Sequence, residues 1–499
     1  MEITVKQGSL TEATCDVLVV NLFEGVTHPG GGTGAVDRAL GGAITELIAD
    51  ENFEGKLGQT ALLHTFGKIA AKKVVIVGLG KSSKFGMDEI RVASSAAAKK
   101  ARDLNAKKIS TILHGAGIGG MDPRDCARAL VEGAVMGTWT AFGGERYKTF
   151  DKKPSPLELI EIVEMDAGKI EGIREGAEIG QIFAEAVNFA RDLIAEPANV
   201  ATPTYLAETA KRIAEEVGLK FRLIDKTEAE RLGMGAFLAV ARGSAQPPTV
   251  SVLKYEPPGA KKTVAIVGKG ITFDTGGLNL KPREGLATMK EDMAGAAAVL
   301  AVMQAVGKLK PKTSVIGIVP ATENMPGANA SRPSDVVTSL SGKTVEINDM
   351  DAEGRVILAD AVALAVKEGA QEIVDVATLT GGCVVALGRG YSGLFGNDEG
   401  LLDRVSAAAR ISGEKLWRLP LPEEYQEFLR SDIADIKNHA GREASPIMGA
   451  MFISNFVGDT PWAHIDIAGT SYLEKESGYN PKGGTGAGTR TLLQLLTEV

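Results

Sequence analysis

The chain has 499 residues, of which 44% are hydrophobic, 24% are charged and only 5% are aromatic, and its net charge is -8. This composition argues against fibrous, disordered and membrane proteins. The length exceeds the roughly 250–300 residues of one hydrophobic core, so we expect at least two globular domains. The negative charge disfavours a nucleic-acid partner, although local basic patches leave that role open. No apolar run approaches the roughly 20 residues that span a bilayer.

We expect a cytoplasmic protein. The three cysteines, Cys15, Cys126 and Cys383, are far apart and form no C-x-x-C pair, which disfavours both a disulfide framework and a thiolate zinc site. The first residues alternate between polar and apolar, as in a first strand, and lack the apolar stretch of a signal peptide. Both observations favour a reducing compartment inside the cell.

Residues 1–165 are expected to form a first α/β domain. Short β-rich runs alternate here with helical stretches, and this alternation is typical of βαβ units around a mainly parallel sheet. The expected strands lie at residues 16–21, 73–78 and 109–114, and the expected helices at 90–104 and 124–136.

Residues 166–499 are expected to form a second, larger α/β domain. Apolar residues recur at helical spacing from about residue 170 to 195, which predicts a long amphipathic linker helix that ends before Pro197. The expected strands of a second parallel sheet lie at residues 250–255, 263–268, 313–320, 372–377 and 464–468.

Four carboxylates follow strands of the second domain, where parallel α/β sheets bind their ligands: Asp274, Asp292, Asp351 and Glu353. The five histidines occur singly, so a metal site here would rely on oxygen ligands. Burying several carboxylates costs several kcal/mol for each ion unless cations compensate. Such a cluster is suited to two divalent ions about 3.5–4 Å apart. The alternative for each carboxylate alone is a helix cap or a surface charge.

Two cationic residues lie near these acids. Arg355 is in the first turn of an expected helix, where its charge is disfavoured by the helix dipole, and this indicates an anion nearby. Lys281 follows Asp274 by seven positions and would by itself be interpreted as a surface lysine.

The run Asp351-Ala352-Glu353-Gly354-Arg355 resembles the central motif of the leucyl aminopeptidases. Similarity to that family covers most of residues 173–499, with further matching blocks, in order, at residues 267–277, 289–297, 377–381 and 462–469. The N-terminal domain, with its glycine-rich loop at residues 29–34, is similar more weakly. The resemblance implies a smaller N-terminal macro-like α/β domain and a larger C-terminal α/β catalytic domain with a mainly parallel or mixed central sheet.

The resemblance also implies two divalent metal ions, Mn²⁺ or Zn²⁺, held by Lys269, Asp274, Asp292, Asp351 and Glu353. The first ion would take Lys269, Asp274, Asp292 and Glu353, and the second Asp274, Asp351 and Glu353. Lysine coordinates a metal only when it is neutral, so burial and a dication must lower its pKa. Lys281 would bond the scissile carbonyl oxygen, and Arg355 would hold a bicarbonate that takes a proton from the bridging water.

The implied substrates are peptides with a free N-terminus, which would bind one of the metals. The pocket for the first side chain would be formed by Met289, Thr378, Leu379, Gly381 and Ala468. Such an apolar pocket favours leucine but discriminates by only roughly 1–3 kcal/mol per methylene, so we expect broad specificity for hydrophobic residues. Ordinary core packing is the alternative for Met289 and Ala468. The resemblance further implies a homohexamer of two stacked trimers.

One departure from the family motif precedes Asp351, where Asn348-Asp349-Met350 replaces Leu-Asn-Thr. The added carboxylate and the lost hydroxyl change the surroundings of the metal ligands, which tune metal affinity. We expect activity to be retained, and the metal preference stays open between Mn²⁺, Co²⁺ and Zn²⁺.

Three other functions compete with the peptidase interpretation. The run Gly115-Ala116-Gly117-Ile118-Gly119-Gly120 follows a strand and fits the nucleotide-binding pattern G-x-G-x-x-G, but it lacks an acidic strand end about 20 residues on. The glycine-rich run 483–488 lacks the lysine of a phosphate-binding P-loop. A metal-dependent phosphoesterase also uses clustered carboxylates, and DNA binding is a second role in some members of the family.

Overall fold

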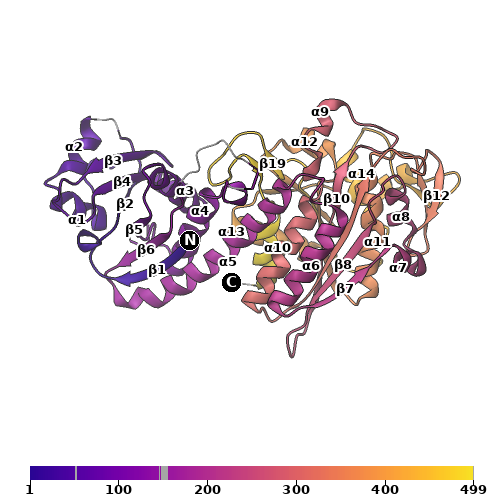
Figure 1. Cartoon of the computed structure of the whole chain (residues 1–499), viewed down its shortest axis with the longest axis horizontal. Coiled ribbons are helices and arrows are strands. Elements are labelled where there is room, and N and C mark those ends of the chain that lie inside the picture. Colours follow the sequence, from indigo (N-terminus) through magenta and orange to yellow (C-terminus); the bar gives the residue numbers. More distant parts are fainter. Residues whose placement is uncertain (51–52, 118, 145, 148–154, 498–499) are drawn as a thin grey trace. The chain divides into compact units, whose positions relative to one another are not determined.

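The computed structural model describes residues 1–50, 53–117, 119–144, 146–147 and 155–497. Ile118 of the G-x-G-x-x-G run therefore lies outside the described residues. The chain forms two compact units, which are described separately (Figure 1). The first contains Met1–Asn188 and Lys475–Lys482, and the second contains Phe189–Glu474 and Gly483–Val499.

The first unit is built on a six-stranded sheet with the order β1-β6-β5-β2-β4-β3. All neighbouring strands are parallel except β3 and β4, which confirms the mainly parallel sheet. The strands are β1 (Glu2–Gln7), β2 (Val17–Leu22), β3 (Thr60–His64), β4 (Lys73–Gly78), β5 (Lys108–Ile112) and β6 (Leu159–Glu164). The helices are α1 (Gly31–Ala39), α2 (Ala43–Asp50), α3 (Met87–Asp103) and α4 (Pro123–Gly137).

Helices cover both faces of this sheet because successive strand residues point to opposite sides. In β2, Leu18 and Val20 pack in one buried cluster, whereas Val17 and Val19 pack in another. Apolar residues at every position of a strand therefore indicate a sheet buried on both faces, as expected from the sequence.

The amphipathic helix expected near residues 170–195 is α5 (Ile170–Ala195). It belongs to both compact units, which divide inside it between Asn188 and Phe189. A domain boundary at residues 165 and 166 therefore stays a prediction.

The second unit is built on a nine-stranded mixed sheet with the order β16-β15-β18-β14-β9-β11-β8-β7, in which β10 also pairs with β11. Strands β18, β14, β9 and β11 are mutually parallel, whereas β8 runs antiparallel to β11 and β7. Strand β15 is antiparallel to β18 and parallel to β16. The strands are β7 (Lys220–Ile224), β8 (Thr249–Tyr255), β9 (Thr263–Gly268), β10 (Gly270–Asp274), β11 (Ser314–Asn324), β14 (Glu372–Ala377), β15 (Ser392–Gly396), β16 (Leu416–Arg418) and β18 (Trp462–Asp466).

Smaller elements surround this sheet. Two short sheets contain β12 (Asp335–Thr338), β13 (Thr344–Ile347) and β17 (Ile436–Lys437), and β19 (Tyr472–Leu473) and β20 (Gly483–Gly484). The helices are α6 (Pro203–Val217), α7 (Lys226–Leu232), α8 (Gly235–Ala241), α9 (Arg283–Leu286), α10 (Ala294–Leu309), α11 (Glu353–Lys367), α12 (Gly381–Leu387), α13 (Glu399–Ser412), α14 (Ser445–Ser454) and α15 (Thr489–Thr497).

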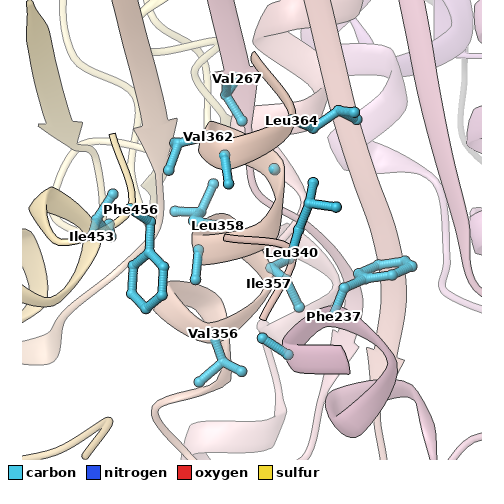
Figure 2. Close-up of a cluster of buried hydrophobic side chains, with 14 of the residues drawn as sticks. Phe237, Val267, Leu340, Val356, Ile357, Leu358, Val362, Leu364, Ile453 and Phe456 are labelled. Carbon is cyan, nitrogen blue, oxygen red and sulfur yellow. The ribbon is translucent and has the colours of Figure 1, made fainter. Parts of the chain in front are cut away.

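The helices α10 and α11, which are almost wholly apolar, lie on opposite faces of the large sheet. Gly317 of β11 faces Met303 of α10, whereas its neighbours Ile316 and Ile318 pack in the cluster that contains α11. Figure 2 shows that cluster, in which side chains of α11 meet residues from several other segments, among them Phe237 and Phe456. A helix that is apolar on all sides is stable only when it is buried. Because the core holds α11 on all sides, the N-terminus of this helix is also held in one position.

Among the described residues, one helical segment, Met289–Leu309, is long and apolar enough to cross a membrane, but 83% of its most apolar window is buried inside the structure. Burial of this extent is the pattern of a core helix.

Candidate active site

The acids and cations singled out in the sequence gather at one edge of the large sheet. Lys269 lies between β9 and β10, and Asp274 ends β10. Glu353 is the first residue of α11, two positions after Asp351, while Asp292 lies in the turn before α10. The carboxyl ends of parallel strands share one edge of a sheet, which is why residues far apart in the sequence meet here.

Lys269 is the centre of one half of the cluster. Its Nζ lies 2.9 Å from Asp292 Oδ1 and 2.8 Å from Glu353 Oε1, and it donates a hydrogen bond to the Thr378 carbonyl at 2.8 Å. All three charged side chains are buried, with exposures of 2–4%. The ammonium therefore stands where a cation is needed to neutralise two buried carboxylates.

Lys281 joins the other half of the cluster. Its Nζ lies 2.8 Å from Asp274 Oδ2 and 2.5 Å from Asp351 Oδ1. One oxygen each from Asp274, Asp351 and Glu353 lie within 4.8 Å of one another, which is a spacing suited to a shared cation. The structure thus brings together all the residues that the sequence nominated as metal ligands, with Lys281 at their edge.

Two buried carboxylate oxygens in the cluster have no hydrogen-bond partner: Asp292 Oδ2 and Glu353 Oε2. Burying a carboxylate oxygen without a hydrogen-bond partner costs free energy, because no protein group replaces the water molecules that it loses. Divalent cations supply that compensation, and hard oxygen donors are the ligands that Mn²⁺ accepts. The residues present therefore fit a metal centre.

The pKa values of the acidic side chains and of Lys269 reflect their burial close to one another. Burial, opposed by Lys269, raises the pKa of Asp292 and of Glu353, and burial also raises that of Asp351. For Lys269, burial disfavours the charge, but Asp292 and Glu353 outweigh it and raise its pKa. Without a metal, protons and lysines neutralise the buried acids.

Metal affinity should consequently rise with pH. Carboxylates with raised pKa values stay protonated to a higher pH, and a proton must leave before a metal binds. We expect the affinity of metal-stripped protein for Mn²⁺, measured by titration calorimetry at about pH 6, 7 and 8, to increase severalfold per pH unit, with proton release. An affinity independent of pH would contradict this assignment.

Arg355 lies in the first turn of α11 and is buried, with 4% exposure. Its Nη1 donates to the Asn438 carbonyl at 3.0 Å, while its Nε has no hydrogen-bond partner. Burial lowers the pKa of Arg355 to about 10, so it is still a cation at neutral pH. Gly449 packs closely beside it, since a Cβ there would lie 3.3 Å from Arg355 Nη2 and 2.9 Å from the Leu379 side chain.

The residues nominated for the substrate pocket lie on three loops at the same edge. Thr378 Oγ1 donates to Asp292 Oδ1 at 2.7 Å, which ties the loop after β14 to the acidic cluster. Met289 is half-buried in the turn that leads to Asp292, and Ala468 follows β18. Gly381 begins α12, is exposed, and has open space where a side chain would extend.

Asp466 holds two of these loops together and was not nominated from the sequence. Its Oδ1 accepts hydrogen bonds from the backbone N–H groups of Leu379 (3.2 Å) and Ala468 (3.1 Å), and its Oδ2 accepts one from Thr380 Oγ1 (2.7 Å). The signal that could have found it is its place in the matching block 462–469, and the structure shows that it ends β18.

Two buried asparagines also escaped sequence analysis. Asn324 Nδ2 donates to Asp274 Oδ1 at 2.8 Å and to the Met350 carbonyl at 2.9 Å. Asn438 Nδ2 donates to the Asp349 carbonyl at 2.6 Å, and its own carbonyl accepts from Arg355. Both orient groups of the cluster, a role that no local pattern reveals.

The unusual residues before Asp351 point away from the acids that share a cation. Asp349 Oδ1 accepts the backbone N–H of Asp351 at 2.9 Å, and its Oδ2 lies 3.7 Å from His439 Nε2. The Met350 side chain is buried in the core cluster beside α11. The departure from the family motif therefore changes the contacts that support Asp351 and α11.

A mixed sheet that carries buried carboxylates, a buried lysine and two partnerless carboxylate oxygens at its edge is the arrangement expected of a metal-dependent enzyme. The chain belongs to the cytosol aminopeptidase family: the model of its catalytic domain matches residues 188–493, and that of its N-terminal domain matches residues 19–149. It is therefore a metal-dependent aminopeptidase, and the family resemblance of its motifs is confirmed.

Curated relatives match over nearly the whole chain. A probable cytosol aminopeptidase of Alkaliphilus metalliredigens is 41% identical and covers 99% of both chains, and one of Geotalea uraniireducens is 43% identical and covers 92% of both. Among solved structures, a mutant of tomato leucine aminopeptidase is 33% identical, with a TM-score of 0.90, over 100% of this chain and 97% of that chain. The bottromycin maturation enzyme BotP in complex with Mn is 36% identical, with a TM-score of 0.85, over 97% of this chain and 99% of that chain.

Proposed function

We propose that the protein removes N-terminal residues, preferably leucine and other hydrophobic residues, from peptides by means of two metal ions. The observation that supports this best is the buried set of Lys269, Asp274, Asp292, Asp351 and Glu353, in which two carboxylate oxygens lack any partner. Lys269, Asp274, Asp292 and Glu353 would hold one ion, and Asp274, Asp351 and Glu353 the other.

Two ions bound at these residues would polarise the scissile carbonyl and lower the pKa of a water molecule. Asp274 and Glu353 belong to both ligand sets, and Asn324 fixes the orientation of Asp274 by its hydrogen bond to Oδ1. Lys269 must lose its proton to become a ligand, because an ammonium has no lone pair. The carboxylates that now raise its pKa would be neutralised by the incoming ions, which removes that obstacle.

Lys281 is placed to stabilise the charge that develops on the carbonyl oxygen. Its side chain is 17% exposed and sits at the edge of the acidic cluster, with Nζ aimed at Asp274 and Asp351. A cation fixed beside the reacting carbonyl stabilises the transition state more than the substrate. The free amino group of a peptide would bind a metal directly, which explains removal of terminal residues only.

Arg355 would hold bicarbonate as the proton acceptor, since its Nε has no hydrogen-bond partner and offers an anion a donor. We expect bicarbonate added to carbonate-depleted assays to raise the activity of the native protein. General-base catalysis contributes about 10²–10⁴-fold, so Arg355→Met should lose about a hundredfold in kcat and no longer respond to bicarbonate. Metal content measured on the same samples is the control. Equal responses of the variant and the native protein would contradict this role.

Gly381 should limit the size of the first side chain, together with Met289, Thr378, Leu379 and Ala468. In Gly381→Leu the new side chain extends into open space, so the fold should tolerate it while the pocket is filled. We expect the preference for leucine anilide over alanine anilide to fall about tenfold or more, at roughly 1–3 kcal/mol per methylene. Gly390→Leu is the matched control, because Gly390 is also exposed and has open space. An unchanged preference would remove Gly381 from the pocket.

The function is tested by hydrolysis of leucine anilide with metal-stripped protein, before and after addition of Mn²⁺ or Zn²⁺. We expect activity only with metal, greater for leucine than for lysine or glutamate anilides, and none on peptides with a blocked N-terminus. A chromogenic phosphate ester distinguishes the phosphoesterase alternative. Hydrolysis of that ester without hydrolysis of the anilide would refute the peptidase function.

The remaining expectations concern location and partners. We propose a cytoplasmic homohexamer of two stacked trimers, acting on peptides and independent of membranes, with DNA binding as a disfavoured second role. The relatives' names refer to the cytosol, which supports the location. A monomeric mass in light scattering would contradict the hexamer. In a gel-shift assay across a salt series, the absence of a DNA shift at low salt would remove the second role.

A further inference from the structure

The first compact unit contains a cavity of about 300 Å³, lined entirely by its own residues. This is the lower end of the size range of small-molecule sites, roughly 300–1,000 Å³. The peptidase function makes no use of it. Asn21 and Leu22 of β2 and Ile112 of β5 lie in its wall, so it opens at the carboxyl ends of these two strands.

The topology of the sheet makes this edge a natural binding crevice. Strands β2 and β5 are parallel neighbours, with Val17 opposite Ile109. After β2 the chain continues to β3 and β4 on one side, whereas after β5 it continues to β6 on the other. In open α/β sheets, ligands bind where connections leave two neighbouring strands in opposite directions.

The loop after β2 presents an anion-binding helix N-terminus to the cavity. Gly30, Gly31, Gly32 and Thr33 line it, and α1 begins at Gly31. The N-cap Gly30 supplies no capping side chain and the first turn has no acidic residue, so the first backbone N–H groups of α1 remain available. Gly31 has a φ of +54° and open space at its Cβ position.

The loop after β5 faces the same cavity with Gly115, Gly117 and Gly119. Packing explains Gly119, where a Cβ would lie 2.6 Å from the Gly115 carbonyl oxygen, and backbone conformation explains Gly115, with a φ of +93°. Neither explains Gly117, which has open space around its Cβ position. Room for a ligand against the backbone is the remaining physical reason for a glycine there.

The two loops follow strands about 4.8 Å apart, a spacing that suits two linked phosphates. Lys169 is the one cation among the lining residues, and its nearest ion-pair partner, Asp166, is 4.0 Å away. Glu164 is the one acidic lining residue, and its Oε1 accepts the backbone N–H groups of Met165 and Asp166. The rest of the wall is largely apolar and suits a flat ring: Leu10, Leu22, Phe23, Val26, Leu79, Ile112, Leu113, Val163 and Met165.

We propose that this cavity binds a nucleoside diphosphate, with the diphosphate against the two glycine loops and Lys169, and the base against the apolar wall. The G-x-G-x-x-G run alone was a weak signal, because glycine turns commonly serve packing. The case for a binding site comes from combining this run with the second glycine loop, Lys169 and the cavity that all of them line. This inference is independent of the proposed peptidase mechanism.

The test is calorimetric titration of the full-length protein, stripped of metal and kept in a chelator so that phosphates cannot bind through metal ions. The probes are ADP, AMP, adenosine and inorganic pyrophosphate. We expect ADP to bind most tightly and adenosine most weakly. Gly117→Glu and Lys169→Glu, which place a negative charge in the cavity, should each weaken ADP binding about tenfold or more.

The controls separate this site from the catalytic one. Gly172→Glu is the matched glycine variant in the same unit, since a Cβ there would lie 3.9 Å from its nearest neighbour, and Lys6→Glu is the matched surface charge reversal. Both should bind ADP normally, and all four variants should retain peptidase activity after metal is restored. No ADP binding at millimolar concentration would overturn the proposal. ADP binding that is unchanged in Gly117→Glu and Lys169→Glu would also overturn it. Equal affinities for ADP and pyrophosphate would show that the cavity does not recognise the nucleoside part of the ligand.

Discussion

Replacing Glu353 by Gln is expected to lower kcat/KM for leucine anilide by more than about a hundredfold. Loss of a group that merely orients a metal ligand already costs about 10–100-fold, and Glu353 is assigned to both ions. The amide keeps the size of the side chain but removes the charge and one acceptor oxygen. Its Oε2 has no partner within the protein, so the substitution breaks no hydrogen bond of that atom.

The measurement combines steady-state kinetics with the metal content of the purified variant. Glu368→Gln is the control, because Glu368 caps the opposite end of the same helix and forms ion pairs with Arg222 and Lys254. We expect that variant to keep its activity and its metal. Full activity of Glu353→Gln, or of protein without metal, would refute the two-metal mechanism.

The second large effect is on stability. In metal-free protein, Lys269→Met removes the only cation within 3 Å of Asp292 Oδ1 and Glu353 Oε1 among the described residues. Breaking a buried ion pair by removing one partner typically costs about 3–5 kcal/mol, because an uncompensated charge remains. We expect a loss of that size in the free energy of unfolding, measured in urea with a chelator present.

The pH dependence identifies the cause. Without Lys269 the folded-state pKa values of Asp292 and Glu353 should rise further. An acid whose pKa is raised by folding loses stability as pH increases above its unfolded value of about 4. The deficit of Lys269→Met should therefore be greater at about pH 8 than at about pH 6. Lys290→Met is the control, since Lys290 is half-buried and donates to the Ala195 carbonyl. A deficit equal to that of the control at both pH values would contradict this explanation.

The amino-acid sequence by itself determined the fold class, because Val17 to Val20 and the similar runs in the other strands are apolar at every position, which only a sheet covered on both faces buries. It also nominated the acids of the cluster, since their residue types and their family motif are properties of short segments. Asp351, Glu353 and Arg355 lie within five positions of one another.

Only the tertiary structure decided which groups support that cluster and where a second ligand would bind. Asp466 contacts Leu379 because the register of β14 and β18 sets Ala377 opposite Asp466. Asn324 contacts Asp274 because β10 pairs with β11. Likewise, the glycines at 30–32 and Gly115, Gly117 and Gly119 line one cavity because β2 lies beside β5. Strand register and order depend on packing across the whole domain, so contacts of this kind leave no pattern in any one segment of the sequence.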